Sequence, residues 1–246
     1  MVLFSLPGGI PVYAFSLLVG LGACAGLAWI AWRAPKKEAL QRVDAGLWVL
    51  FGSLCGGRIV YCAVHWPYFQ SHPWEIPQVY LGGLSWPGAL LGGLVALALY
   101  ARLAHLPLCA LADALLPMLI PLAVGAWLGC WLDGCAYGPL APAWWGIPAR
   151  DEWGVVEYRL PVQLLGAFLC VGCFWLLEHF TKNSRPGWYA SLGLLGLSLI
   201  LFGLSFLRAD PALVWRGLRL EVWASLAFAV LALLALVMVF IYNRGR

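Results

Sequence analysis

An apolar run long enough to cross a membrane ends in a polar, glycine-rich segment in the stretch "LIPLAVGAWLGCWLDGCAYG", Leu119 to Gly138. Glycines at roughly helical spacing would line one face of an unbroken helix, but the polar residues between them are unusual inside a bilayer. The glycines are Gly129, Gly134 and Gly138, and the polar residues are Cys130, Asp133, Cys135 and Tyr137. We therefore expect the helix to stop near Gly134, with Asp133 and Tyr137 facing a cavity that lipid can reach.

The composition places the whole chain in a membrane. Of 246 residues, 63% are hydrophobic and 11% are charged, and the mean hydropathy is +0.86, whereas soluble domains contain about 45–50% apolar and about 25% charged residues. A span needs about 20 apolar residues. Seven spans can be drawn, at about Ile10–Trp32, Ala45–Val64, Leu84–Ala104, Cys109–Leu132, Pro161–Phe180, Tyr189–Leu207 and Val222–Tyr242. We expect an all-α integral membrane protein that forms a single polytopic domain over residues 1–246.

The lysines and arginines predict the orientation of these spans. Positively charged loops are retained on the cytoplasmic side, and every lysine falls in loops on one side of the predicted bundle. The inner set is Arg33, Lys36, Lys37, Arg42, Arg102, Lys182, Arg185, Arg244 and Arg246. The N-terminus is then outside and the C-terminus is cytoplasmic. The outer segments still contain arginines, which either meet an anionic headgroup or pair with nearby carboxylates: Arg150, Arg159, Arg208, Arg216 and Arg219.

A break in regular structure is expected before the third span. The segment "LGGLSWPGALLGG", Leu81 to Gly93, contains paired glycines and a Pro87-Gly88 pair. Proline lacks an amide donor and glycine relaxes the backbone, so the pattern predicts a re-entrant turn or a broken helix. Non-helical backbone at membrane depth needs protein or a water-filled cavity beside it. We expect this segment to share a cavity with Gly129–Gly138.

Arg58 is the clearest ionisable residue inside a predicted span. It follows two glycines in "CGGRIVYC", Cys55 to Cys62. An ionisable side chain within the bilayer is costly and usually faces the protein interior, so it is a candidate site residue. Two interpretations remain open. Arg58 binds a phosphate or an internal carboxylate such as Asp133, or it is a salt bridge or carbonyl clamp that fixes helix register.

The eight cysteines do not predict a disulfide framework, because most lie within apolar runs, where cysteine behaves as a small hydrophobic residue. Cys130 and Cys135 are different, since Asp133 lies between them. If the helix unwinds at Gly134, the three side chains could converge on a soft metal, or the two sulfurs could form a redox-active disulfide. Alternatively, both sulfurs fill gaps beside glycines and Asp133 caps a helix turn.

Five segments, in this order, resemble the landmark segments of bacterial prolipoprotein diacylglyceryl transferases. They are "GGRIVY", "HPWEIPQVYLGGLSWPGALLGG", "ADALLPMLIPLAVGAWLGCWLDGCAYG", "RLPVQLLGAF" and "FLRADP". The resemblance implies a seven-span protein of the bacterial inner membrane that moves a diacylglyceryl group from phosphatidylglycerol to the lipobox cysteine of a prolipoprotein. The implied partners are an anionic phospholipid, a prolipoprotein signal peptide and the membrane. We expect no cofactor, no metal and no nucleic acid.

The resemblance also suggests site residues. Positions that match the family landmarks are Arg58, Gly82, Gly83, Ser85, Gly88, Gly92, Gly129, Gly134, Gly138, Pro161, Gln163 and Arg208. From these and the polar segment, the predicted substrate-binding residues are Arg58, Ser85, Gly88, Cys130, Gly134, Gly138, Gln163 and Arg208. The predicted catalytic residues are Asp133, Cys135 and Tyr137, of which Tyr137 would donate a hydrogen bond. Arg150, Arg159 and Arg208 are candidates for binding phosphate.

Several positions depart from the family pattern. Pro87 stands where a histidine is expected, Trp127 where an arginine is expected, and Cys135 where an acidic residue is expected. Leu201 and Phe15 replace an expected arginine and tyrosine, and Cys130 and Asp133 replace expected asparagines. These departures leave a second interpretation open. In it the protein is a catalytically inactive or repurposed paralogue that binds phospholipid and acts as a membrane scaffold or complex subunit.

The predicted orientation can be tested at Lys37. A Lys37→Cys variant should be labelled by a membrane-impermeant maleimide only after the cells are opened, because residues 34–44 are predicted to be cytoplasmic. Labelling of Lys37→Cys in intact cells would show that the orientation is inverted.

Overall fold

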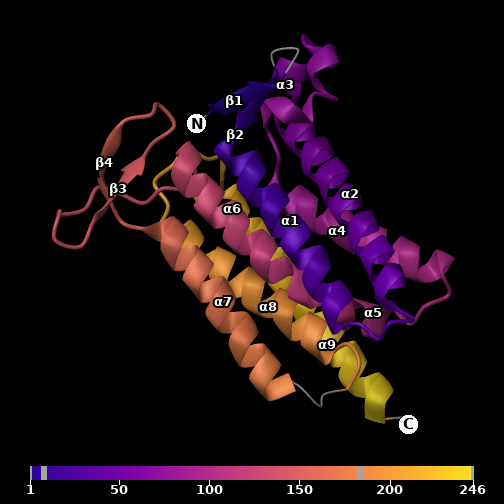
Figure 1. The fold of residues 1–246 in the computed structure, drawn as a ribbon. Coiled ribbons are helices and arrows are strands. Elements are labelled where there is room, and N and C mark those ends of the chain that lie inside the picture. The colour runs from indigo at the N-terminus through magenta and orange to yellow at the C-terminus, as the bar shows by residue number, and fades with distance from the viewer. Residues whose placement is uncertain (1, 7–9, 182–184, 245–246) are drawn as a thin grey trace. The chain divides into compact units, whose positions relative to one another are not determined.

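The computed structural model describes residues 2–6, 10–181 and 185–244. In these residues, seven helical segments are long and apolar enough to cross a membrane (Figure 1). They are α1 (Ala14–Arg33), α2 (Ala39–Val64), α4 (Trp86–Leu103), the segment Leu108–Asp133, α7 (Val162–Thr181), α8 (Trp188–Ser205) and α9 (Leu220–Arg244). The predicted all-α, seven-span class is confirmed. The orientation remains a prediction, and two lysine or arginine residues used to predict it, Lys182 and Arg246, lie outside the described residues.

The chain divides into two compact units. Unit 1 contains Tyr13–Gly26 and Leu116–Arg246, and unit 2 contains Val2–Val12 and Leu27–Leu115. Within unit 1, helix α6 (Leu119–Asp133) packs on α7, α7 packs on α8, and α8 packs on α9. Within unit 2, the main contact joins α2 and α4. The prediction of one domain stays a prediction.

The fourth span is interrupted. It begins as α5 (Leu108–Leu115), continues as the 3-10 helix η3 (Leu116–Met118) and ends as α6. Pro117 lies in η3 and Pro121 in the first turn of α6. Proline cannot donate the i to i−4 hydrogen bond, and its ring displaces the preceding carbonyl, so the change of helix type at this point follows from the sequence.

The start of the first span differs from the prediction. Residues Ile10–Tyr13 form strand β2, which pairs with β1 (Val2–Leu6), and α1 starts only at Ala14. Pro11 removes an amide donor, and Ile10 and Val12 are β-branched, so this short segment suits an extended edge strand better than a helix. Two further hairpins lie in segments that were predicted only as loops: β3 (Ile147–Arg150) with β4 (Val156–Arg159), and β5 (Val214–Trp215) with β6 (Leu218–Arg219).

The irregular segment before the third span is confirmed. After α2 come α3 (Trp66–Phe69) and two 3-10 turns, η1 (Pro73–Glu75) and η2 (Val79–Leu81). Gly82 and Gly83 then adopt φ values of 90° and 78°. Residues with a side chain disfavour this region of φ, whereas glycine adopts it readily. Helix α4 starts at Trp86 with Pro87 in its first turn, where proline is tolerated because that amide has no helical partner.

Glycines allow α2 and α4 to approach closely in unit 2. A Cβ atom added to Gly56 would lie 2.4 Å from the Gly88 carbonyl oxygen, and one added to Gly92 would lie 2.2 Å from the Gly52 carbonyl oxygen. These distances leave no room for a side chain on either helix. Close packing of small residues is the usual basis of helix association in lipid.

Gly56→Leu should therefore separate α2 from α4. Overpacking typically costs about 1–3 kcal/mol, and here the clash is with backbone, so we expect a lower melting temperature in detergent. Gly172→Leu in α7 is the matched control, because nothing lies within 4 Å of a Cβ at that position. Equal melting temperatures for the two variants would contradict the packing described here.

Candidate functional site

Helix α6 ends where the sequence predicts. Its last residue is Asp133, and Gly134 caps it in the left-handed conformation, with φ 76° and ψ 36°. The Cys135 amide donates to the Cys130 carbonyl oxygen at 3.0 Å, which closes the final turn. A Cβ on Gly134 would also lie 2.3 Å from the Asp151 carbonyl oxygen. Gly134 is therefore required both by its backbone conformation and by the close approach of the following loop.

Asp133 caps a different helix. Its carboxylate accepts a hydrogen bond from the Phe15 amide at 3.0 Å, in the first turn of α1, which has no acidic residue of its own. A carboxylate at this position satisfies a free amide and favours the positive end of the helix dipole. The interpretation of Asp133 as a helix cap is confirmed. Its predicted catalytic role stays a prediction.

Cys130 and Cys135 form a disulfide. Their Cα atoms are 4.6 Å apart, and the bridge spans the same turn as the hydrogen bond between their backbones. Two interpretations gave these cysteines a chemical role, as ligands of a soft metal or as a disulfide. The structure contains the disulfide. The Cys135 sulfur is consequently no free nucleophile in this state.

Tyr137 is buried beside Arg159. Its hydroxyl donates to the Glu152 carboxylate, and the Arg159 guanidinium carbon lies 4.6 Å from the centre of its ring. Burial and the hydrogen bond to Glu152 raise the pKa of Tyr137 to about 12. The phenol therefore stays protonated at neutral pH and is available as a hydrogen-bond donor.

Arg159 carries a buried charge with spare hydrogen-bonding capacity. It is only 8% exposed and pairs with Asp151 and Glu157, each at 3.2 Å, so for Arg159 the interpretation as a partner of nearby carboxylates is borne out. Its Nε atom is nevertheless buried and has no hydrogen-bond partner in the part of the chain that the structure describes. A buried donor in this condition costs about 1–3 kcal/mol, so it is a candidate to meet a ligand oxygen or a water molecule.

Gln163 and Gly138 hold the loop after α6 against the start of α7. Gln163 is fully buried, and its side-chain amide donates to the Cys135 carbonyl oxygen at 3.0 Å. The other end of that side chain, Oε1, is buried without a partner among the described residues. A Cβ on Gly138 would lie 2.5 Å from the Leu160 carbonyl oxygen. Both residues therefore fix the loop that carries Tyr137.

Arg208 belongs to a closed ionic network. It binds Asp210 through two hydrogen bonds, at 2.9 and 2.6 Å, and Glu221 at 3.0 Å, while Arg219 contacts the same two carboxylates. Burial alone would lower the pKa of Arg208, but the hydrogen bonds and charges of Asp210 and Glu221 raise it. In addition, the Ala209 amide donates to the Tyr137 carbonyl oxygen at 2.8 Å. The network thereby supports the loop that carries Tyr137.

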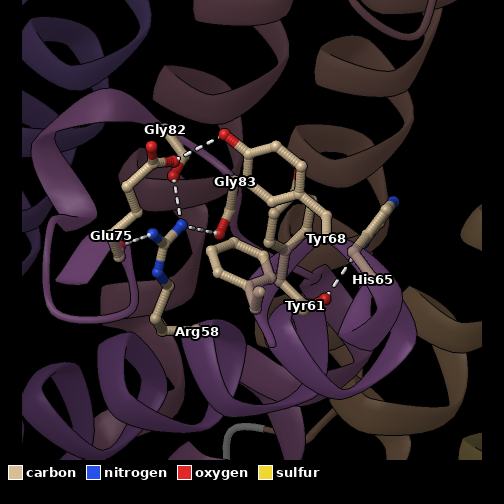
Figure 2. Close-up of a pocket in the computed structure, with 8 residues that line it drawn as sticks. Arg58, Tyr61, His65, Tyr68, Glu75, Gly82 and Gly83 are labelled. Carbon is tan, nitrogen blue, oxygen red and sulfur yellow. Dashed lines mark hydrogen bonds between the residues drawn. The ribbon is translucent and has the colours of Figure 1, made fainter. Parts of the chain in front are cut away.

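In unit 2, Arg58 is a carbonyl clamp. It is 7% exposed, and its guanidinium donates to backbone oxygens of the irregular segment after α3 (Figure 2). The acceptors are Ile76 at 2.8 Å, Gly82 at 2.6 Å, Gly83 at 3.0 Å, Glu75 at 2.5 Å and, more weakly, Gln78 at 3.5 Å. Of the two interpretations of Arg58, the clamp is the one that these contacts bear out.

The clamp forms one wall of a pocket of about 370 Å³. Figure 2 shows the lining side chains, and the full set is Arg58, Tyr61, His65, Tyr68, Phe69, Glu75, Gly82 and Gly83. The Tyr68 hydroxyl donates to the Glu75 carboxylate at 2.8 Å, and this hydrogen bond, together with burial, raises the pKa of Tyr68. Sequence reasoning identified Arg58 and missed the other side chains. The signal available was the density of aromatic and ionisable residues between His65 and Tyr80.

Two further predicted residues lie at the start of α4. Ser85 is its N-cap residue, and its amide donates to the Gly57 carbonyl oxygen at 3.0 Å. Gly88 lies in the first turn, where a Cβ would be 2.4 Å from the Gly56 carbonyl oxygen. Both positions join α4 to α2. The predicted cavity shared by Ser85, Asp133 and Tyr137 would need residues from both units, and it stays a prediction.

These features define a class of protein: a multi-pass membrane protein whose helix ends are held by buried polar side chains, with a pocket braced by a buried arginine. The family model described as prolipoprotein diacylglyceryl transferase matches residues 1–238. The chain belongs to this family. It is a multi-pass protein of the bacterial inner membrane.

Curated relatives agree with this assignment. The chain is similar to three proteins named phosphatidylglycerol–prolipoprotein diacylglyceryl transferase. The one from Thermosynechococcus vestitus is 27% identical over 84% of this chain and 81% of the relative. The one from Synechococcus elongatus is 27% identical over 97% and 87%, and the one from Gloeobacter violaceus is 30% identical over 93% and 89%.

The clamp predicts what loss of Arg58 does. Arg58→Met keeps much of the side-chain length but removes the donors to these partly buried carbonyl groups, and a hydrogen bond from a charged group contributes about 1.5–3 kcal/mol. We expect a lower melting temperature in detergent and less copurified phospholipid, because the pocket loses a wall. Arg102→Met, at an exposed position in the last turn of α4, is the control. A melting temperature of Arg58→Met equal to that of the control would show that Arg58 is not a clamp.

Proposed function

We propose that this protein transfers a diacylglyceryl group from phosphatidylglycerol to the cysteine thiol of a prolipoprotein signal peptide. In this reaction the sulfur forms a bond to the terminal glycerol carbon of the diacylglyceryl group. The bond between that carbon and the phosphate oxygen breaks, and glycerol phosphate leaves with the electron pair. The thiol proton passes to a base.

Family membership and the names of the relatives support this function. They do not favour the alternative of an inactive scaffold, which rested on the replaced positions Pro87, Trp127 and Leu201. Trp127 shows how one replacement is accommodated. Its indole is buried, and a Cβ on Gly166 of α7 would lie 2.4 Å from it, so it packs two helices of unit 1 together.

The observation that supports a site in unit 1 most strongly is the buried, unpartnered Nε of Arg159. As the leaving phosphate gains charge, it needs a cationic or amide partner that is already in place. Arg159 provides a guanidinium held on the face of the Tyr137 ring, and its Nε–H has no partner among the described residues. We assign phosphate binding to Arg159 rather than to Arg208. Arg208 pairs with Asp210 and Glu221 and so belongs to the ionic network that supports the loop carrying Tyr137.

Tyr137 and Glu152 supply the groups for moving a proton. The phenol donates to the carboxylate, and its raised pKa keeps it protonated. Glu152 is then the base that accepts the thiol proton, and Tyr137, whose single O–H is donated to Glu152, holds that carboxylate in position. Asp133, which was predicted to be catalytic, is proposed to act by holding the start of α1 against the end of α6.

The remaining predicted site residues are proposed to shape the binding surfaces. In unit 1, Gly134, Gly138 and Gln163 set the course of the loop that carries Tyr137, and Cys130 and Cys135 bridge its first turn. In unit 2, Arg58, Ser85 and Gly88 build the pocket wall and the start of α4. With the donors of Arg58 turned to backbone oxygens, that pocket offers acceptors, Glu75 and His65, which suit the hydroxyl groups of a phospholipid headgroup.

The reaction is tested by incubating the purified protein with phosphatidylglycerol and a lipobox peptide. A mass gain of one diacylglyceryl group on the peptide thiol is expected. No gain, with native lipid still copurifying, would favour the scaffold.

Arg159 should matter far more than Arg150, although both belong to the β3–β4 hairpin. Arg159→Ala removes the proposed phosphate partner, and loss of one preorganised donor typically costs about 10²- to 10³-fold in kcat. Arg150→Ala changes an exposed arginine of the same hairpin and should keep activity near the wild-type value. Equal activities for the two variants would remove Arg159 from the site.

Tyr137→Phe isolates the hydroxyl group. The variant keeps the ring under Arg159 but loses the donor, and we expect kcat to fall about 10²-fold, as for loss of a positioned acid–base group. Tyr158→Phe, at an exposed tyrosine of β4, is the matched control. A Tyr137→Phe variant as active as Tyr158→Phe would show that the hydroxyl is not used.

A further inference from the structure

The disulfide joins the last turn of α6 to the segment that presents Tyr137. Cys130 lies in that turn and Cys135 follows the cap Gly134, so the bridge encloses the point where the helix stops. The other six cysteines, all within the described residues, are free. The bridge therefore occurs at the one helix end that carries the candidate site residues of unit 1.

The backbone just after the bridge is strained. Ala136 adopts a φ of 54°, in the left-handed region that non-glycine residues rarely occupy. Such a conformation is energetically unfavourable and persists only when its surroundings hold it in place. The holding contacts on one side are the disulfide and the hydrogen bond from Gln163 to the Cys135 carbonyl oxygen. On the other side, the Tyr137 carbonyl oxygen accepts from Ala209.

We propose that the Cys130–Cys135 disulfide is a positioning element for Tyr137. While the bridge is closed, it holds the strained turn at Ala136 and thereby keeps the Tyr137 ring under Arg159 and its hydroxyl on Glu152. When the bridge opens, the turn relaxes and Tyr137 withdraws from Arg159. The effect on catalysis rests on the proposed function, whereas the effect on the position of Tyr137 does not.

The bridge closes or opens by exchanging electrons and protons with a second thiol–disulfide couple. Closing it converts two thiols into one disulfide, with loss of two electrons and two protons. These pass to a disulfide of an oxidoreductase or of a small molecule, which becomes two thiols. An excess of dithiol reverses the reaction. Persistence of the bridge requires an oxidising compartment, which agrees with the predicted location of this end of α6 outside the cytoplasm.

The first experiment measures the bridge and the position of Tyr137 without any activity assay. Membranes containing the full chain are alkylated before and after reduction with a phosphine, using two reagents of different mass, and the peptides are identified by mass spectrometry. Cys130 and Cys135 should carry only the second reagent. Thiols that react before reduction, in membranes kept under air, would overturn the proposal.

The same samples are labelled with hydroxyl radicals. Tyr137 is 5% exposed, so it should be protected while the bridge is closed and label severalfold faster after reduction. The exposed Tyr158 on β4 provides an internal reference whose labelling should not change. Unchanged labelling of Tyr137 would overturn the positioning role even if the bridge is present.

The second experiment uses transfer kinetics. Cys130→Ala/Cys135→Ala should lower kcat about a hundredfold, the scale of a small displacement at a reacting group. Combined with Tyr137→Phe, it should have little further effect, because both changes remove the same contribution. Cys24→Ala/Cys109→Ala replaces two exposed free cysteines and should keep wild-type activity.

The outcomes separate the two ideas. If the wild type shows no transfer but Tyr137 responds to reduction, the proposed function fails and the positioning role stands. If the wild type is active and the bridge and Tyr137 variants lower kcat independently, the positioning role fails and the function stands.

Discussion

The structure depends on the need to give every buried backbone group a hydrogen-bond partner where a membrane helix stops. A bilayer core offers no water for this purpose, so protein groups must supply the donors and acceptors. Arg58 supplies donors to the carbonyl groups of the irregular segment before α4. Asp133 accepts from the first turn of α1, and Gln163 donates to the loop after α6.

The same requirement explains why the functional candidates gather at breaks in the helices. A break exposes backbone, and the buried polar side chains that satisfy it bring charge and hydrogen-bonding groups into a low-dielectric region. At the end of α6 this produces the group of Tyr137, Glu152 and Arg159, in which the buried Nε donor of Arg159 has no partner among the described residues. In unit 2 it produces a pocket beside Arg58 that is also lined by Glu75, His65 and two tyrosines. Structural support and the proposed chemistry are thus assigned to adjoining residues.

The sequence predicted the spans and the breaks because both are local signals. Apolar length gave the seven spans, and the glycines at positions 82, 83 and 134 marked the points where regular structure stops. The partners could not be predicted, since they depend on contacts between residues far apart in the chain. Phe15 and Asp133 are separated by 118 positions, and the sequence left open whether the donors of Arg58 bind a phosphate, a carboxylate or backbone carbonyl groups. The short hairpins were missed because two to five residues carry too little periodicity to identify a strand.

The central claim is that a buried side chain replaces water at the break before α4, and solid-state NMR of the protein in phosphatidylglycerol bilayers tests it most directly. Distances from the guanidinium nitrogens of Arg58 can be measured both to backbone carbonyl carbons and to lipid phosphorus. The account predicts close contacts with the carbonyl groups of Ile76 and Gly82 and no short distance to phosphorus. A short nitrogen–phosphorus distance, with those carbonyl contacts absent, would contradict it.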